Sequence, residues 1–512
     1  MPGPLLPLRI ALPTAVLAGL MLWLAFPPVA VGPSAILGVA LLSAALWRAS
    51  VRRGLGLGLL AGLVFFLLLL EWMRIIGLDA WVLLALLCAS WITLLGAATA
   101  LVTRLPAAPV WIASVWVLEE TIRGRIPFGG FPWGNLAFAQ PDVMLAEWAR
   151  VGGTPLVTFV VALIGSALVP VAISVRRREI RPAAAWLAVV IAVSVLPLAL
   201  PTTDGGDLVG GPAEATIALV QGGTPQTGMG AMDVRRAVLD NHVAQTMLLA
   251  AAINSGDQPR PAFVLWPENA SDIDPFADAD AADAISAAAK AVGAPILVGA
   301  VTSVPGNPDG VWNVGIVWDP DAGPTQMYIK THPVPFGEYI PFRDLVASLI
   351  GRFDRVPRDF IPGTEPGNLE IGGVAVGNVI CFEIAYGEVV DAVVDGGARV
   401  LTVQTNNATY GDTSQPAQQL GIERMRAIES GRSLLVASTS GISAVVTSAG
   451  GIEQSLDEGV QGWLMADVPL RGEQTLATRA GHLLEFLLCL VAVAAVLLGA
   501  SWSRVTRRRG IT

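Results

Sequence analysis

The chain has 512 residues, of which 53% are hydrophobic and only 14% are charged, and its mean hydropathy is +0.61. These values exclude a single large soluble enzyme, in which about 25% of residues are charged, and the high apolar content excludes a disordered chain. The net charge of −9 argues against a nucleic-acid partner, and three cysteines exclude a disulfide scaffold.

Apolar stretches near the length of about 20 residues that a bilayer requires occur in residues 1–205 and again close to the C-terminus. We predict seven spans followed by an eighth, at 10–26, 31–47, 54–71, 81–102, 107–119, 156–173, 183–200 and 483–502. The segment 107–119 is short and ends in the paired Glu119 and Glu120. Residues 1–205 are therefore interpreted as a transmembrane bundle, 483–502 as a C-terminal transmembrane helix, and 503–512 as a basic cytoplasmic tail.

Arginines cluster between alternate predicted spans. They are Arg48, Arg52 and Arg53, then Arg104, then Arg176, Arg177, Arg178 and Arg181, and finally Arg504, Arg507, Arg508 and Arg509. All four places lie on one side if every span crosses once, and the positive-inside tendency makes that side cytoplasmic. The region 214–470 is then extracytoplasmic. Residues 1–30 are either a retained anchor or a cleaved signal peptide, and the closely following second span favours the anchor.

Residues 214–470 have a mixed composition that predicts an α/β domain. The strand-like runs, rich in Val and Ile, are 215–220, 262–266, 295–302, 311–318, 325–329, 372–380, 399–404, 433–438 and 443–447. Helical stretches at 232–253, 277–292 and 415–430 lie between several of them. Three runs follow one another without a helix, so we expect a mixed sheet that contains hairpins.

Cys381 is the one cysteine of this domain. A free cysteine is most often a buried, small apolar residue. However, Cys381 ends the apolar run 374–380 and precedes a helical stretch. A nucleophile at such a strand-to-helix turn is exposed, and backbone N–H groups of the turn can hold an oxyanion.

Two further strand ends carry ionisable residues, Glu268 after the run 263–266 and Lys330 after 327–329. If the three strands converge at one sheet edge, Glu268 is placed as general base and Lys330 as the cation that activates the Cys381 thiol. The alternatives are a helix or turn cap for Glu268 and a solvated surface charge for Lys330. Spacing alone does not decide between these interpretations.

Three segments resemble, in this order, the signatures of the carbon–nitrogen hydrolase (nitrilase) superfamily. They are Trp266-Pro267-Glu268-Asn269, the stretch 328–341, and Ile380-Cys381-Phe382-Glu383. The pattern Lys-x-His-x-x-Pro-Phe-Gly-Glu at 330–338, placed after seven spans and before one, is similar to the apolipoprotein N-acyltransferase family in particular. Supporting segments are Phe131-Pro132-Trp133, Val220-Gln221-Gly222 and 424–432.

The resemblance implies an α-β-β-α sandwich with the triad Glu268, Lys330 and Cys381, in a multi-pass protein of the bacterial cytoplasmic membrane. The thiolate attacks a phospholipid acyl ester, and the resulting thioester acylates the α-amino group of a diacylglyceryl-modified apolipoprotein. Glu338 and Glu383 are the implied supporting carboxylates, and the N–H of Phe382 joins Lys330 at the oxyanion. A monomer without cofactor is implied. The scattered His242, His332 and His482 show no metal-ligand spacing, and His332 is expected to be a structural neighbour of the lysine.

The stretch 333–353 is unusually apolar for a domain surface. We interpret it as a lid that dips into the lipid interface and protects the thioester from water; the alternative is an ordinary core helix. The residues expected to line the lid or bind substrate are His332, Phe336, Tyr339, Phe342, Leu349, Ile350 and Asn406.

The sequence departs from the family pattern at three places. Phe382 stands where a tyrosine is common, 227–230 lacks the usual tryptophan, and Asn406-Asn407-Ala408-Thr409-Tyr410 replaces an Asn-Asp-x-Trp-Phe segment. These changes concern acyl-chain or headgroup preference more than the triad. Two other functions stay open: a membrane-anchored amidase or nitrilase with water as acceptor, and a non-catalytic scaffold that escorts lipoproteins. Eight spans argue against the first, and the retained triad argues against the second.

Overall fold

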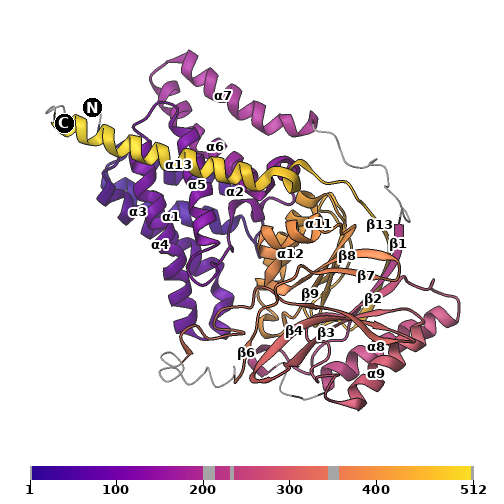
Figure 1. The fold of residues 1–512 in the computed structure, drawn as a ribbon. Coiled ribbons are helices and arrows are strands. Elements are labelled where there is room, and N and C mark those ends of the chain that lie inside the picture. The colour runs from indigo at the N-terminus through magenta and orange to yellow at the C-terminus, as the bar shows by residue number, and fades with distance from the viewer. Residues whose placement is uncertain (1–2, 200–213, 231–233, 235, 344–356, 509–512) are drawn as a thin grey trace. The chain divides into compact units, whose positions relative to one another are not determined.

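The computed structural model describes residues 3–199, 214–230, 234, 236–343 and 357–508, which divide into two compact units (Figure 1). The first unit comprises Met1–Thr202 and Thr475–Thr512, and the second comprises Thr203–Gln474.

The first unit is helical. Its long helices are α1 (Leu8–Leu24), α2 (Ser34–Leu46), α3 (Val51–Leu69), α4 (Leu78–Val102), α5 (Ala108–Arg123), α6 (Ala149–Arg176), α7 (Ile180–Val195) and α13 (Leu476–Arg508). Short 3-10 turns connect them: η1 (Glu71–Ile75), η2 (Leu136–Ala139), η3 (Met144–Trp148) and η4 (Leu196–Ala199).

Five apolar helices of the described chain have the length and composition to cross a membrane: Val51–Leu69, Leu78–Val102, Met144–Arg176, Ile180–Ala199 and Leu476–Trp502. The expectation of about eight spans is therefore met only in part. The helices at the other three predicted spans, α1, α2 and α5, have only 17, 13 and 16 residues. Helix α2 is short because Pro33 precedes it and the backbone turns at Arg48, which has a positive φ of 56°.

Helices α3 and α4 pack through small residues. Gly54, Gly58 and Gly62 recur every fourth residue and form one face of α3. A Cβ atom added at Gly54 would lie 2.5 Å from the carbonyl oxygen of Gly96, and one at Gly58 would lie 2.5 Å from that of Ile92. Only glycine permits this backbone approach, as in other membrane helix pairs.

The second unit contains two mixed β-sheets. The first has the order β13-β1-β2-β3-β4-β5 with β6 beside β4, and the second has the order β12-β11-β10-β9-β8-β7. The strands of the first sheet are β1 (Glu214–Gln221), β2 (Phe263–Leu265), β3 (Ile296–Val304), β4 (Asn307–Asp319), β5 (Gly323–Ile329), β6 (Asp359–Phe360) and β13 (Gly462–Pro469). Those of the second are β7 (Asn368–Ile371), β8 (Val374–Ile380), β9 (Val400–Thr405), β10 (Leu434–Ser438), β11 (Ser443–Val446) and β12 (Ile452–Leu456).

The helical elements of this unit flank the sheets (Figure 1). They are α8 (Ala237–Asn254), α9 (Ala279–Val292), α11 (Gly387–Asp395) and α12 (Gln415–Ser430), with the 3-10 turns η5 (Gly228–Gly230), η7 (Cys381–Ala385) and η8 (Ala408–Tyr410).

Strand alternation builds two separate apolar cores. On β1, Ile217 and Leu219 belong to the core between the sheets, whereas Ala218 and Val220 belong to the core under α8 and α9. This division follows from the period of two in a strand. The result is a four-layer α-β-β-α arrangement, the nitrilase-like fold that the resemblance implies.

The apolar runs predicted most strands, but the domain contains more strands than predicted. The run 372–380 corresponds to β8 alone. Strand β7 precedes the run and was not predicted; Gly372 and Gly373, both at positive φ, join it to β8 in a hairpin. Strands β6, β12 and β13 were not predicted either. Strand β6 has only two residues, and β12 and β13 contain exposed positions and lack a continuous apolar run.

Candidate active site

Glu268 follows β2 and is held close to β3. A Cβ atom at Gly299 would lie 2.1 Å from the carbonyl oxygen of Pro267, so only glycine lets the Glu268 segment cross this strand. The Glu268 side chain is buried, and its Oε2 accepts a hydrogen bond from the backbone N–H of Asn406 (2.9 Å). The carboxylate is therefore fixed from both sheets.

Lys330 follows β5 and is 1% exposed. Its Nζ donates to Glu268 Oε1 (3.1 Å) and to Glu338 Oε1 (2.8 Å). The alternative of a solvated surface charge is therefore wrong. Glu338 Oε2 also accepts from the N–H of Val334 (2.6 Å), which ties this carboxylate to the segment after the lysine.

Asn313 is a site residue that sequence reasoning missed. It is 2% exposed in the middle of β4, and its Nδ2 donates to Glu268 Oε1 (2.7 Å) and Glu338 Oε1 (2.9 Å). Its main-chain carbonyl accepts from the N–H of Lys330 (2.9 Å). A polar residue within the apolar run 311–318 was the available signal, because a buried amide requires partners.

Cys381 begins the turn η7, directly after β8. Its φ is +55°, a conformation that a non-glycine residue adopts at an energetic cost and that clusters at functional sites. The residue is partly buried, and its Sγ accepts a hydrogen bond from Thr405 Oγ1 (3.3 Å). The sharp strand-to-turn geometry expected of a nucleophile is therefore present.

The charges of Glu268 and Lys330 both act on the thiol. Burial and the negative charge of Glu268 raise the pKa of Cys381 to about 12, although Lys330 and the Thr405 hydrogen bond lower it. Lys330 was expected to lower the thiol pKa, which it does, but burial outweighs it. The resting nucleophile is therefore a thiol, which needs a base for attack.

Burial also raises the pKa of Glu268, against the opposing effect of Lys330. For Lys330, burial lowers the pKa, but Glu268 and Glu338 outweigh it, so the pKa stands well above the usual value. A carboxylate with a raised pKa is a stronger base, and a lysine that stays charged is a permanent cation.

The three residues do not meet at the edge of one sheet, as the strand ends suggested. Glu268 and Lys330 come from the first sheet and Cys381 from the second. Convergence arises because the sheets stack face to face: Gln404 of β9 donates to the carbonyl oxygen of Trp266 (2.8 Å).

Glu383 is fully buried and joins the two sheets at the site. Its Oε1 accepts from the N–H groups of Thr331 (2.7 Å) and His332 (3.0 Å), and its Oε2 accepts from that of Ile380 (2.9 Å). Tyr328 Oη donates to both oxygens at 3.0 Å. These contacts hold the segment after Lys330 against the turn of Cys381.

The other expected residues surround this centre. Phe382 is 9% exposed and packs edge-on against Tyr386, whose ring also stacks on His332 at 4.8 Å. Asn406 supports Glu268 through its N–H, and its own Oδ1 accepts from the N–H of Ala408 (3.1 Å).

In the described part of the expected lid, two aromatic side chains are exposed. Phe336 and Phe342 are 43% and 71% exposed and both have positive φ, whereas Tyr339 is partly buried. Leu349 and Ile350 lie outside the described residues.

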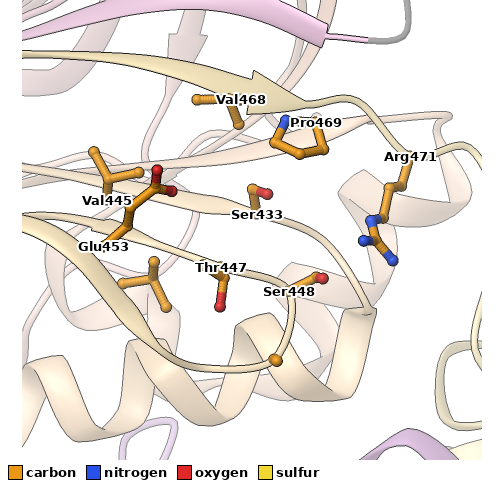
Figure 2. Close-up of a pocket in the computed structure, with 10 residues that line it drawn as sticks. Ser433, Val445, Thr447, Ser448, Glu453, Val468, Pro469 and Arg471 are labelled. Atoms are coloured by element: carbon orange, nitrogen blue, oxygen red, sulfur yellow. The ribbon is translucent and has the colours of Figure 1, made fainter. Parts of the chain in front are cut away.

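No group of three or more His, Cys, Asp or Glu side chains in the described chain is placed to hold a metal ion. A cavity of about 320 Å³ lies elsewhere in the domain, and Figure 2 shows its lining. Its polar residues are Ser433, Thr447, Ser448, Glu453 and Arg471. Glu268, Lys330 and Cys381 do not line it, so it is separate from the candidate site.

Comparison with known proteins gives matches over both units. The sequence profile of the apolipoprotein N-acyltransferase N-terminal domain matches residues 18–167, and that of carbon-nitrogen hydrolases matches residues 243–477. The chain is 39% identical to an apolipoprotein N-acyltransferase of Mycolicibacterium smegmatis, over 98% of this chain and 88% of the relative. It is 31% identical to one of Gloeobacter violaceus, over 85% and 84%. A solved amidase from Nesterenkonia sp. aligns with 22% identity and a TM-score of 0.38, over 55% of this chain and 99% of the amidase.

Proposed function

This chain belongs to the apolipoprotein N-acyltransferase family, and we propose that it moves an acyl chain from a phospholipid to the N-terminus of a lipoprotein through a thioester on Cys381. The observation that carries this proposal is the buried ion pair between Lys330 and Glu268 (3.1 Å), whose charges act on a thiol at a strained turn.

In the first half-reaction, Glu268 takes the proton of the Cys381 thiol as Sγ attacks the ester carbonyl. The S–C bond forms, the ester C–O bond breaks, and the proton passes to the departing lysophospholipid oxygen. Two of the three Lys330 ammonium protons are directed at Glu268 and Glu338, and the third serves the oxyanion together with the N–H of Phe382.

In the second half-reaction, the α-amino group of a diacylglyceryl-modified N-terminal cysteine attacks the thioester. Glu268 accepts the amine proton, the N–C bond forms and the C–S bond breaks, and Glu268 passes the proton to Sγ, which restores the thiol. The Glu383 oxygens already accept several hydrogen bonds, so its role is to position the segment after Lys330 rather than to bind the amine.

The setting of this reaction is also part of the proposal. We assign 214–470 as the catalytic domain on the extracytoplasmic side of the bacterial cytoplasmic membrane, with eight spans and a monomeric protein. The asymmetry of arginines between alternate spans supports this orientation. The exposed rings of Phe336 and Phe342 form the described part of a lid that contacts acyl chains.

Intact-mass measurement of the detergent-purified protein after incubation with phospholipid tests the proposal, with Cys381→Ser as control. We expect a hydroxylamine-labile gain of one acyl chain that the control lacks and that a diacylated lipopeptide discharges. No adduct on a Cys381 that still reacts with alkylating reagents would instead favour an amidase that uses water as acceptor.

A further inference from the structure

A set of buried polar side chains connects Cys381 to helix α12. Its members are Thr405 (1% exposed), Asn407 (3%), Gln415 (5%), Gln419 (2%) and Glu423 (1%). Gln415, Gln419 and Glu423 are spaced by four residues and therefore share one face of α12. All three residues are polar although they are buried, whereas the inward face of a helix is usually apolar.

Glu423 sets the direction of the hydrogen bonds in this set. The ionised carboxylate can only accept, and Glu423 Oε1 accepts from Gln419 Nε2 (2.9 Å). The Gln419 amide is thereby oriented with its Oε1 toward Asn407 Nδ2 (3.0 Å) and Gln415 Nε2 (3.1 Å), both of which are donors.

The second proton of the same Gln419 amide group points to Thr405. Gln419 Nε2 donates to Thr405 Oγ1 (3.0 Å). The hydroxyl therefore acts as an acceptor on this side, and its single proton is directed at Cys381 Sγ (3.3 Å), with Asn407 Oδ1 (3.4 Å) as the competing acceptor. A reversed Gln419 amide would present an oxygen to Thr405 and draw this proton away from the sulfur.

We propose that Glu423 is a positioning residue for the nucleophile: by orienting the Gln419 amide, it makes the Thr405 hydroxyl a donor to Cys381 Sγ. A donor at this distance stabilises the thiolate as it forms and weakens when the sulfur becomes a thioester. The inference rests on the proposed role of Cys381 and adds a hydrogen-bond donor to Sγ that comes from Thr405 and helix α12.

The test measures alkylation of Cys381 by iodoacetamide in the full-length protein, resolved by peptide mass spectrometry so that Cys88 and Cys489 serve as internal references. The measurement is made at pH 9, because burial raises the pKa of Glu423 to about 8 and the carboxyl is charged above it. The variants are Thr405→Val, Thr405→Ser, Glu423→Met and the double variant Thr405→Val/Glu423→Met. Gln418→Met is the matched control, since Gln418 is buried on the same helix and donates to Ser414 instead.

We expect Thr405→Val to slow alkylation about tenfold, equivalent to a rise of about one unit in the thiol pKa. Glu423→Met should slow it about threefold or more, and the double variant should be no slower than Thr405→Val alone. Thr405→Ser and Gln418→Met should react like the wild type. Unchanged alkylation in Glu423→Met, or an equal effect of this substitution in the Thr405→Val background, would overturn the inference.

Two further measurements keep the outcomes separable. If Glu423→Met does not fold, Glu423→Gln replaces it. The new amide can present either its oxygen or its NH₂ group to Gln419, so we expect an alkylation rate between those of the wild type and Thr405→Val. The wild-type acyl adduct is measured in parallel. If the wild type forms no adduct but the variants show the expected alkylation rates, the proposed function is contradicted and the positioning network stands. If the wild type forms the adduct but the alkylation rates differ from those expected, only the network is contradicted.

Discussion

Each unit of this protein buries a cation between two carboxylates, but the two clusters are built differently. In the helical unit, Arg123 is 2% exposed and pairs with Glu119 (2.7 Å), with Glu120 beside it. In the sandwich, Lys330 is 1% exposed and pairs with Glu268 and Glu338. Burial of charge alone therefore does not identify the reactive site.

The helical cluster serves main-chain groups. Arg123 donates to the carbonyl oxygens of Phe131 (3.1 Å) and Trp133 (2.5 Å). Glu120 accepts from the N–H of Leu136 (2.7 Å) and from Thr158 Oγ1 (2.7 Å). The planar guanidinium thereby fastens the connection after α5, which contains the Phe131-Pro132-Trp133 segment, to α5. Glu120 links the same connection to α6 through Thr158.

The sandwich cluster instead surrounds a thiol. Its cation is a compact ammonium whose acceptors are ionisable side chains, and its charges change the pKa of Cys381. The comparison shows that Arg123 holds a loop through backbone carbonyls, whereas the Lys330 ammonium binds carboxylates and alters the pKa of a neighbouring thiol, as the proposed reaction requires.

The largest expected effect comes from Lys330→Met. It removes the oxyanion cation and leaves Glu268 beside Glu338 without a counter-charge, so acyl-adduct formation should fall about 10³-fold. The rate is measured by intact mass, with Lys290→Met as control because Lys290 is exposed on α9. A Lys330→Met rate within tenfold of the wild type would contradict the assigned role.

Arg123→Leu should act on stability rather than on chemistry. It leaves two buried carboxylates without a counter-charge and two carbonyl oxygens without their Arg123 donor, so the free energy of unfolding should fall by about 3–5 kcal/mol. The remaining folded protein should form adduct at the normal rate. Thermal unfolding in detergent measures this loss. Arg74→Leu, which removes the exposed pair with Glu71, is the control and should change stability by less than about 1 kcal/mol. Equal losses in the two variants would remove the contrast between the clusters.

Gly299→Ala should displace Glu268 without altering any charged residue. The added methyl group would meet the carbonyl oxygen of Pro267 and force this segment to shift, so adduct formation should fall about 100-fold. Gly472→Ala is the control, because nothing lies within 4 Å of the added atom. Normal activity in Gly299→Ala would show that the site tolerates a displaced base.

Acid should weaken the sandwich through His242, which no part of the reaction uses. Burial lowers the pKa of His242 to about 4, from an ordinary value of 6.5. Between pH 6.5 and pH 4, therefore, His242 is protonated in the unfolded state but neutral in the folded state. Stability therefore falls as the pH falls through this window, by about 2 kcal/mol at pH 5. The difference between wild type and His242→Gln, measured by hydrogen exchange in α8 at pH 8 and pH 5, isolates this effect. Identical pH dependence in both proteins would contradict it.

The sequence by itself determined the division into an apolar helical part and an α/β part, because hydropathy and strand-like runs are local properties. The single cysteine of the domain and the ionisable residues at two strand ends, together with three signature segments, also pointed to Glu268, Lys330 and Cys381. It did not determine how many helices reach spanning length. Apolar composition continues through prolines and turns that end a helix, as Pro33 and Arg48 bound α2.

Only the tertiary structure decided which sheet carries each residue of the proposed triad and what surrounds the thiol. Glu268 and Lys330 reach Cys381 across the stacked sheets, at separations along the chain for which a sequence has no periodic signal. Asn313, Thr405 and Gln419 acquire their roles in the same way. A polar residue within a strand or on a helix has no assigned partner until packing excludes water and every buried donor must find an acceptor.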